Sequence, residues 1–233
     1  MINILHHEKI EDERLPEGAT ATIHIFCVQV TDVKAYAESL VKEITDTSWI
    51  SQLDPVAKMS YETIATKTIE KLVELFKTIE NKVTSDFGEF MVSLSSGKCL
   101  NDKHSHTCLP ISELWKEKIL GNHGFDFHTI SPEERFSFGE AKYQSTGNAY
   151  TSSAGQVHEF SKSGKDKADA VHLMHFGSPQ SIQNLQDGRK GYVVAFSLNS
   201  DDHNLILNNA LKNDDVIALS TLCDELYLVG VKV

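Results

Sequence analysis

Residues 124–130 (GFDFHTI) and 136–142 (FSFGEAK) decide the fold, because they have the features of two paired strands. Both runs are rich in apolar and aromatic side chains, whereas the residues between them, 131–135 (SPEER), are charged and include a proline. Short apolar runs on either side of such a break are typical of a β-hairpin. The sequence therefore predicts a hairpin over residues 124–142.

The register of this hairpin brings ionisable side chains together. If Ile130 pairs with Phe136, counting outward places Asp126 directly opposite Glu140. Side chains alternate along a strand, so Lys142 projects from the same face as Glu140. Directly opposed residues have Cβ atoms only about 4.5–5.5 Å apart, where two like charges are destabilising unless a positive charge compensates them.

A divalent cation would supply that charge, and carboxylates are the hard oxygen ligands by which proteins hold Mg²⁺. We therefore expect Asp126 and Glu140 to bind Mg²⁺, with Mn²⁺ as a substitute. Lys142 would orient or deprotonate a water and balance the charge of a phosphate. Both Glu140 and Lys142 are expected to be solvent-accessible, so that their replacement by alanine leaves the fold intact.

The sequence motifs of this hairpin resemble those of a nuclease family. Asp126, followed on the next strand by Glu140-x-Lys142, resembles the metal-binding hairpin of the PD-(D/E)xK nuclease superfamily. With residues 86–94 (DFGEFMVSL) upstream, these motifs are similar to the C-terminal domain of the HamA nucleases of Hachiman-type bacterial antiphage defence. The resemblance extends over residues 87–233.

This resemblance implies an α/β fold with a restriction-endonuclease-like core, in which helices flank a mixed central sheet. It implies a Mg²⁺-dependent deoxyribonuclease that works with a HamB-like helicase subunit, which engages DNA and restrains the nuclease until activation. It also implies that the Ala141 carbonyl is a further metal ligand and that Glu89, on the helix before the hairpin, approaches the metal. Glu89 is equally explained as a surface residue of a charged helix, and Glu113 and Glu117 are alternative donors.

Two glutamines are candidates for contact with the scissile phosphate. Gln144 follows the second strand of the hairpin on the face of Lys142. Gln156 lies on an expected helix, four residues before an aromatic side chain, as in some exonuclease-like members of the superfamily. Solvated surface positions explain both equally simply.

Apolar spacing predicts the remaining elements. Residues 19–30 are rich in β-branched side chains and predict a strand, followed by an amphipathic helix. Two helices are expected between residues 60 and 100, the second ending at residues 95–97 (SSG). A helix opening near residue 151, strands at 191–198 and 225–233, and a helix at 205–211 complete a sheet flanked by helices.

We divide the chain into two parts. Residues 1–83 would form a small N-terminal α/β region, a candidate partner-docking lobe. Residues 84–233 would form the nuclease-like domain. With 233 residues and 40% hydrophobic content, the chain can bury one good core or two small ones.

Charge argues for a partner. The chain has 22 Lys and Arg against 33 Asp and Glu, a net charge of −11, the opposite of the basic surface expected of a protein that holds DNA alone. The segment 161–190 is locally basic and would contact phosphate or form a solvated face. Its cations are Lys162, Lys165, Lys167, Arg189 and Lys190.

Residues 1–18 lack the basic start and apolar centre of a signal peptide, and no run reaches the roughly 18 apolar residues of a membrane span. We therefore expect a cytoplasmic protein without membrane contact. The four cysteines are scattered, so we expect reduced thiols. His104, His106 and Cys108 alternate and would suit a soft metal, but no second pair of ligands follows in the sequence.

Two other functions compete with the nuclease. In the first alternative, the chain is a non-catalytic subunit that keeps the nuclease fold and regulates a helicase. The presence of Asp126, Glu140 and Lys142 together argues against that, because a decayed site usually loses one of them. Alternatively, the protein is an unrelated acidic α/β protein with a chance motif, which predicts no metal binding.

Overall fold

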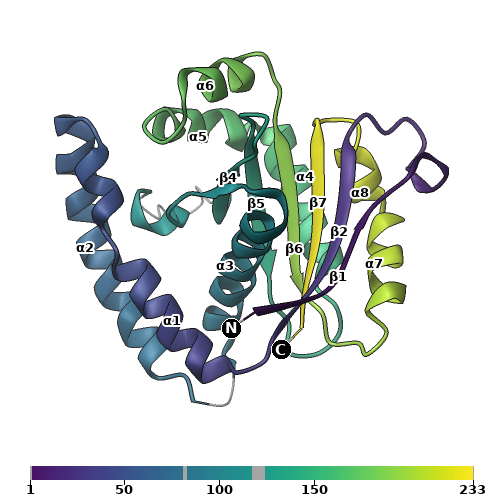
Figure 1. Cartoon of the computed structure of the whole chain (residues 1–233), viewed down its shortest axis with the longest axis horizontal. Coiled ribbons are helices and arrows are strands. Elements are labelled where there is room, and N and C mark those ends of the chain that lie inside the picture. The colour runs from purple at the N-terminus through teal and green to yellow at the C-terminus, as the bar shows by residue number, and fades with distance from the viewer. Residues whose placement is uncertain (1, 81–82, 117–123, 233) are drawn as a thin grey trace.

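The computed structural model describes residues 2–80, 83–116 and 124–232, and its strands form one mixed seven-stranded sheet (Figure 1). The strand order is β1-β2-β7-β6-β5-β4-β3. Strands β5, β6, β7 and β2 run parallel to one another, whereas β1 and β4 pair antiparallel at either side. The strands are β1 (Ile2–Lys9), β2 (Thr22–Val30), β3 (Thr107–Cys108), β4 (Phe127–Ile130), β5 (Phe136–Lys142), β6 (Gly191–Ser197) and β7 (Glu225–Lys232).

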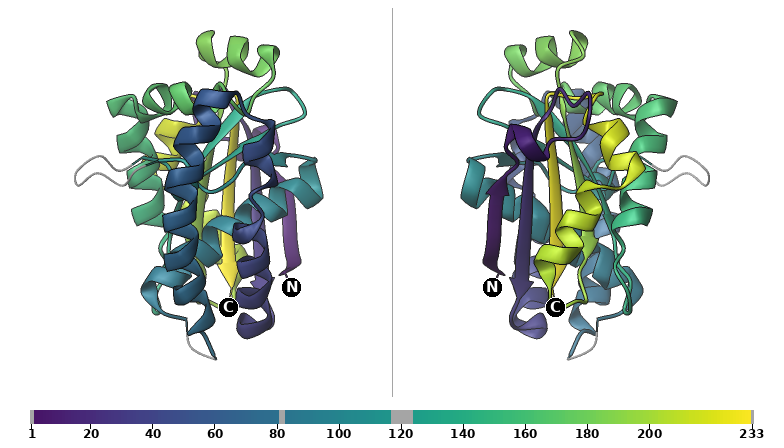
Figure 2. Two further views of the ribbon diagram at one scale, coloured as in Figure 1. Left: turned by 90° about the vertical axis from the view of Figure 1, so that its left-hand side faces the viewer. Right: turned by 90° about the vertical axis from the view of Figure 1, so that its right-hand side faces the viewer.

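Helices cover both faces of this sheet (Figures 1 and 2). Helix α3 packs across one face and contacts β2 through β7, while α4, α7 and α8 cover the other face. Helices α5 and α6 lie at one end of the sheet, and α1 and α2 form a separate pair beyond α3. The helices are α1 (Val33–Thr45), α2 (Pro55–Lys77), α3 (Ser85–His104), α4 (Tyr150–Ser163), α5 (Lys165–Leu173), α6 (Pro179–Gln186), α7 (His203–Leu211) and α8 (Asp214–Leu219), with short 3-10 turns at η1 (Asp12–Arg14), η2 (Ser48–Gln52) and η3 (Ser112–Leu114).

The expected α/β class, with a mixed sheet flanked by helices, is confirmed. Every residue of β6 is buried, and so is every residue of β7 except the last. Nearly continuous apolar runs of this kind are typical of central parallel strands covered on both faces. None of the helices in the described ranges is long and apolar enough to cross a membrane.

The predicted hairpin, the strand before α1, the helix α4 and the strands β6 and β7 are all present. Strand β1 has no counterpart among the predicted elements. It is a half-exposed edge strand whose polar residues, including two consecutive histidines, hide the strand pattern.

The expected end of the second helix at residues 95–97 is wrong, because α3 continues to His104. Serines weaken a helix when their hydroxyls compete for the backbone, but these hydroxyls have partners in the folded chain. Ser96 donates to the Val92 carbonyl at 2.8 Å, and Ser95 donates to the hydroxyl of Tyr36 on α1 at 2.9 Å. Packing between α1 and α3 therefore outweighs the local stop signal.

The predicted boundary after residue 83 falls between α2 and α3. Strands from both sides of it belong to the same sheet, since β2 pairs in parallel with β7 from Thr22–Glu225 to Gln29–Lys232. Phe76 of α2 also packs edge-on against Phe87 of α3, with ring centroids 5.2 Å apart. The N-terminal residues are thus part of the same hydrophobic core as the hairpin.

Helix α3 approaches β5 closely at Gly88. A Cβ atom at this position would lie 2.2 Å from the ring of Tyr143, the residue that follows β5. Only a residue without a side chain fits there, since such a distance is far inside van der Waals contact. This contact places the next residue of the helix, Glu89, beside the end of β5.

We predict that Gly88→Ala destabilises the protein by about 1–3 kcal/mol, the usual cost of overpacking a core. Alanine has a higher helix propensity than glycine, by about 1 kcal/mol, so the steric clash has to exceed that gain. The measurement is urea unfolding at pH 7. Gly155→Ala in α4 is the matched control, because its Cβ would meet only the end of the Asp215 side chain at 3.4 Å, and it should be neutral or stabilising. Equal effects of the two substitutions would contradict the proposed packing constraint.

Candidate active site

The hairpin has the predicted register. Ile130 pairs with Phe136, and the ladder runs to Phe127 and Gly139. Asp126 lies one residue before β4, and its backbone N–H donates to the Gly139 carbonyl at 2.9 Å. The ladder thus ends just short of the expected direct pairing of Asp126 with Glu140.

The Asp126 side chain instead crosses to the backbone of β5. Its Oδ2 accepts a hydrogen bond from the Ala141 N–H at 2.9 Å. The Phe127 ring lies over Gly139, where an added Cβ would come within 2.3 Å of it. The missing side chain of Gly139 therefore makes room for packing between the strands, and Ala141 fixes the position of the carboxylate.

Glu140 is buried, with 1% of its surface exposed. The expectation that it is solvent-accessible is wrong, because α3 and α4 pack on the two faces of β5. Its Oε1 accepts from the Lys142 ammonium at 2.9 Å, and its backbone carbonyl accepts from Ser153 at 2.9 Å. Its Oε2 is buried and has no hydrogen-bond partner among the described residues.

Lys142 at the end of β5 also contacts helix α3. Its Nζ lies 2.9 Å from Glu140 Oε1 and 3.8 Å from Oε1 of Glu89, whose side chain is 44% exposed. The structure thus brings Asp126, Glu140, Lys142 and Glu89 into one cluster. Within it, Glu140 is buried, Asp126 is partly buried, and Glu89 on α3 is partly exposed.

The other candidates are placed differently. Gln144 is exposed, its backbone bonds to Ser197, and none of the hydrogen bonds in the described chain joins its side chain to the cluster. Gln156 is partly buried on α4. Glu113 on η3 is close enough to influence the ionisation of Asp126. Glu117 falls outside the described residues.

Burial and like charge disfavour ionisation of the carboxylates. Burial, with a smaller contribution from Glu113, raises the pKa of Asp126 to about 7, even though the Ala141 N–H opposes the shift. Burial and the neighbouring Asp126 raise the pKa of Glu140 well above its ordinary value, against the opposing effect of Lys142. Near neutral pH the pair therefore retains protons unless a cation stabilises the ionised form.

Lys142 is a cation and not a base. Burial lowers its pKa, but the negative charges of Glu140 and Glu89 raise it by more, so the net shift is upward. A lysine must have a lowered pKa to remove a proton from water near neutral pH. The expected role of Lys142 in deprotonating a water is therefore not supported, and orientation and charge balance remain.

The ligand types of the cluster suit a hard divalent cation, but the oxygens of Asp126, Glu140 and Glu89 do not all lie within 4.8 Å of one another, so an ion would have to draw these three side chains together. Adjacent carboxylates provide oxygen ligands, which Mg²⁺ and Mn²⁺ prefer over nitrogen or sulfur. The unpartnered Glu140 Oε2 is a buried acceptor that lacks a donor, and such an atom is costly without a ligand. Asp126, Glu140 and Glu89 are the side chains that would hold the ion.

A second cluster of polar side chains, which the sequence did not predict, surrounds His128 of β4. His128 on β4 contacts Ser112 at 3.3 Å and Asp169 of α5 at 3.0 Å, and Asp169 also pairs with Lys116 at 2.6 Å. Ser112, His128 and Asp169 are all buried. Burial lowers the pKa of His128 to about 4, despite the opposing hydrogen bond that its ring makes to the Asp169 carboxylate. The contacts among Ser112, His128 and Asp169 therefore join α5 to the hairpin, while the buried Lys116 Nζ pairs with Asp169 by charge and lacks a hydrogen bond of good geometry among the described residues.

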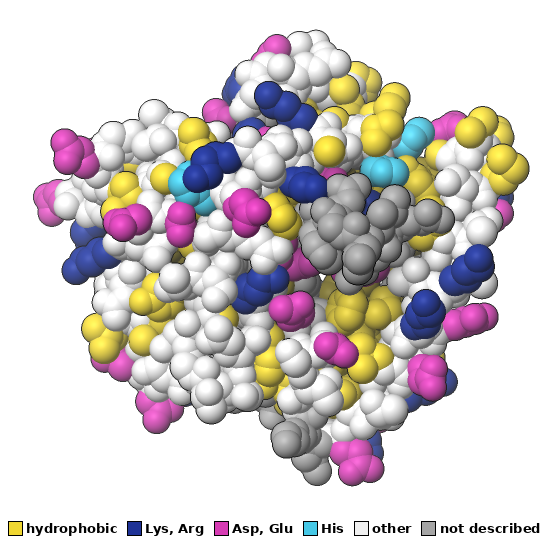
Figure 3. All heavy atoms as spheres, turned by 180° about the vertical axis from the view of Figure 1, so that it is seen from behind, with side chains coloured by type: hydrophobic (Ala, Val, Ile, Leu, Met, Phe, Trp, Pro, Cys, Tyr) yellow, Lys and Arg dark blue, Asp and Glu magenta, His cyan; other side chains and the backbone are white. Residues whose placement is uncertain are grey.

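The basic segment contributes fewer free cations than its sequence indicates. Lys190 pairs with the buried Asp166 of α5, whereas Lys162, Lys167 and Arg189 are exposed. On the face seen in Figure 3, Lys and Arg side chains are scattered among Asp and Glu and form no continuous basic surface among the described residues.

Comparison with protein-family models and with curated proteins found no match to this chain. The resemblance to PD-(D/E)xK nucleases therefore stays a prediction from the sequence motifs.

We predict that the metal-free protein loses stability as pH rises from about 4 to about 7. A carboxyl group with a raised folded-state pKa binds protons more tightly in the folded chain, so its contribution is complete below the ordinary pKa and is lost as pH passes the folded value. Glu140→Gln should weaken this dependence and raise the free energy of unfolding at pH 8, because burial and the neighbouring Asp126 disfavour the negative charge that the substitution removes.

The measurement is urea unfolding in EDTA between pH 5 and 8.5, with Glu74→Gln on the exposed face of α2 as the control. Addition of Mg²⁺ at pH 8 should stabilise the wild-type protein and leave Glu140→Gln unchanged, since ligands stabilise only the state that binds them. The part of the dependence contributed by Asp126 should remain, and a dependence as steep in Glu140→Gln as in the wild type would mean that Glu140 does not contribute.

Proposed function

We propose that this protein is a metal-dependent deoxyribonuclease of the PD-(D/E)xK type, similar to HamA. The observation that carries the proposal is the buried Glu140, one oxygen of which has no partner among the described residues, beside the partly buried Asp126 and the Lys142 ammonium. Glu89 adds a third carboxylate from α3. Because burial raises the pKa of Asp126 and of Glu140, a cation would favour their ionised forms, which suits a metal-assisted reaction on a phosphodiester.

Each residue has a task in that reaction. A bound Mg²⁺ would supply a Lewis acid for the scissile phosphate and lower the pKa of a bound water. Asp126 is held in place by the Ala141 N–H, so its carboxylate is positioned before substrate arrives. Lys142 is a fixed positive charge that would orient the attacking water and stabilise the added charge on the phosphate.

Substrate delivery by a partner is the second part of the proposal. The net charge of −11 and the scattered cations on the face in Figure 3 offer little attraction for a DNA backbone. A helicase subunit of the HamB kind would present the strand to the site, as in an antiphage defence complex. The exposed Lys162, Lys167 and Arg189 would then make the local phosphate contacts.

A non-catalytic subunit that regulates a helicase is the competing function. Burial of Glu140 favours it, because the carboxylate is shielded from solvent and already paired with the Lys142 ammonium at 2.9 Å. The two functions differ in whether the site cuts DNA when metal is supplied.

We predict that the purified protein degrades plasmid or linear DNA at low salt with Mg²⁺ or Mn²⁺, and that EDTA stops the reaction. Glu140→Gln and Lys142→Ala should each lower the rate by about 100-fold or more, the usual effect of removing a group that stabilises transition-state charge. The readout is the rate of strand cleavage on a gel.

Lys71→Ala on the exposed face of α2 is the matched control and should cut at the wild-type rate. Circular dichroism of each variant checks that the loss is not unfolding. Equal cutting by wild type and Glu140→Gln would contradict the assigned site. Mg²⁺-dependent stabilisation without any cutting, even with a helicase partner and ATP, would favour the non-catalytic function.

A further inference from the structure

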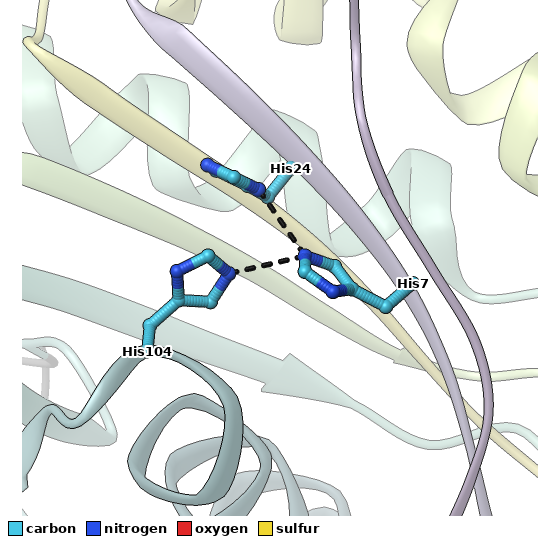
Figure 4. Close-up of side chains that lie close together, drawn as sticks. All are labelled: His7, His24 and His104. Atoms are coloured by element: carbon cyan, nitrogen blue, oxygen red, sulfur yellow. Dashed lines mark hydrogen bonds between the residues drawn. The ribbon is translucent and has the colours of Figure 1, made fainter.

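Three histidines from distant parts of the sequence meet on the α3 side of the sheet (Figure 4). His7 comes from β1, His24 from β2, and His104 from the last turn of α3. His7 Nε2 lies 3.3 Å from His24 Nδ1 and 3.1 Å from His104 Nε2. One ring nitrogen from each of the three lies within 4.8 Å of the others.

Hydrogen bonding does not account for this arrangement. Both contacts converge on a single atom, His7 Nε2, as Figure 4 shows. A ring nitrogen of a neutral imidazole carries either one proton or one lone pair, so it makes one good hydrogen bond and not two. One of the two nitrogen contacts is therefore left without a satisfactory bond.

A shared metal ion does account for it. Zinc binds imidazole nitrogen at about 2.0–2.1 Å with tetrahedral geometry, which places neighbouring ligand nitrogens about 3.3–3.4 Å apart. The distances of 3.1 and 3.3 Å from His7 Nε2 are close to that spacing. The third nitrogen pair would close slightly as the rings turn toward a common centre.

Aromatic neighbours hold the imidazoles in place. His7 is paired with Phe26 across the β1–β2 ladder, and their rings stack 4.4 Å apart. His24 is paired with Tyr227 on β7, and their rings stack 5.7 Å apart. Rings that are already positioned lose little freedom when a ligand binds, so the site is preorganised.

His106 does not belong to this group, although the sequence pattern pairs it with His104. Its two ring nitrogens bond to Thr129 at 2.8 Å and to the Tyr227 hydroxyl at 3.1 Å. The structure therefore does not group His104, His106 and Cys108 as a soft-metal site, in line with the missing second pair of ligands in the sequence. Residues from the other end of the chain take the places of His106 and Cys108.

We propose that His7, His24 and His104 bind one divalent transition-metal ion of the zinc class, with the fourth position left to water or another ligand. Imidazole suits zinc, copper and nickel, whereas Mg²⁺ selects oxygen ligands. Burial lowers the pKa of all three histidines, that of His24 to about 3, and the neutral ring is the form that binds metal.

This site is separate from the carboxylate cluster. Glu89 lies in the second turn of α3 and His104 in its last turn, so the two sites are about 22 Å apart along the helix at 1.5 Å per residue. The ion would tie the edge strand β1 to β2 and to the end of α3. An otherwise exposed edge strand would thereby be fixed to the body of the protein.

The test uses the full chain after metal removal. Equilibrium dialysis against Zn²⁺, read by elemental analysis, should find one ion per wild-type chain, and Co²⁺ should give the visible absorption of a tetrahedral nitrogen site. His7→Ala and His104→Ala should each weaken Zn²⁺ binding by more than about tenfold, a loss that even outer-shell substitutions reach. Zn²⁺ should also raise the melting temperature of the wild-type protein and not that of the variants.

His6→Ala is the matched control, because His6 precedes His7 on β1 but lies near His203 of α7, with ring centroids 5.8 Å apart. It should bind Zn²⁺ as the wild type does. Circular dichroism verifies that each variant folds. If His104→Ala does not fold, His7→Gln serves as a second test of the site, because His7 is exposed and its replacement disturbs the core less. Zn²⁺ uptake that is equal in the wild type and the His7 variants, or reduced as much in His6→Ala, would overturn the proposal.

Discussion

The close packing of α3 against the sheet is the constraint on which the rest of the structure depends. Gly88 allows the helix to lie against Tyr143, and this contact sets the distance between Glu89 and the Lys142 ammonium. The same helix carries His104 at its other end. A rigid buried helix transmits its position along its full length, so both proposed metal sites depend on where α3 sits.

The carboxylate cluster combines burial with an excess of negative charge. Asp126, Glu140 and Glu89 share one lysine, and the most buried of the three, Glu140, has an oxygen without a partner. A protein selected for stability alone would replace such a group with apolar side chains, because buried charges are costly unless they are fully paired. Strain of this kind is typical of functional sites, where a ligand supplies the missing interaction.

Local patterns predicted the central strands and the hairpin register but not the edge strand β1 or the contacts between distant segments. Ile130 and Phe136 pair as counted, because alternation and a short loop leave few possible registers. Burial of Glu140 did not follow from its strand, since α3 and α4 provide the cover. His7 and His104 lie 97 positions apart, and Asp169 lies 41 positions from His128, so no spacing in the sequence indicates that they meet.

Because the carboxylate cluster and the three histidines would bind different metal ions, the effect of a chelator on activity has two possible causes. EDTA would remove Mg²⁺ from oxygen ligands and a zinc-class ion from imidazoles, and the second loss would loosen β1 and the end of α3. Loss of cleavage in EDTA alone therefore does not identify the catalytic ion. Restoration by Mg²⁺ in a His7→Ala background would assign cleavage to the carboxylates, because that background lacks the imidazole site but keeps Asp126 and Glu140. Failure of Mg²⁺ to restore cleavage there, with Glu140 intact, would mean that the position of α3 set by the imidazole site controls the carboxylate cluster.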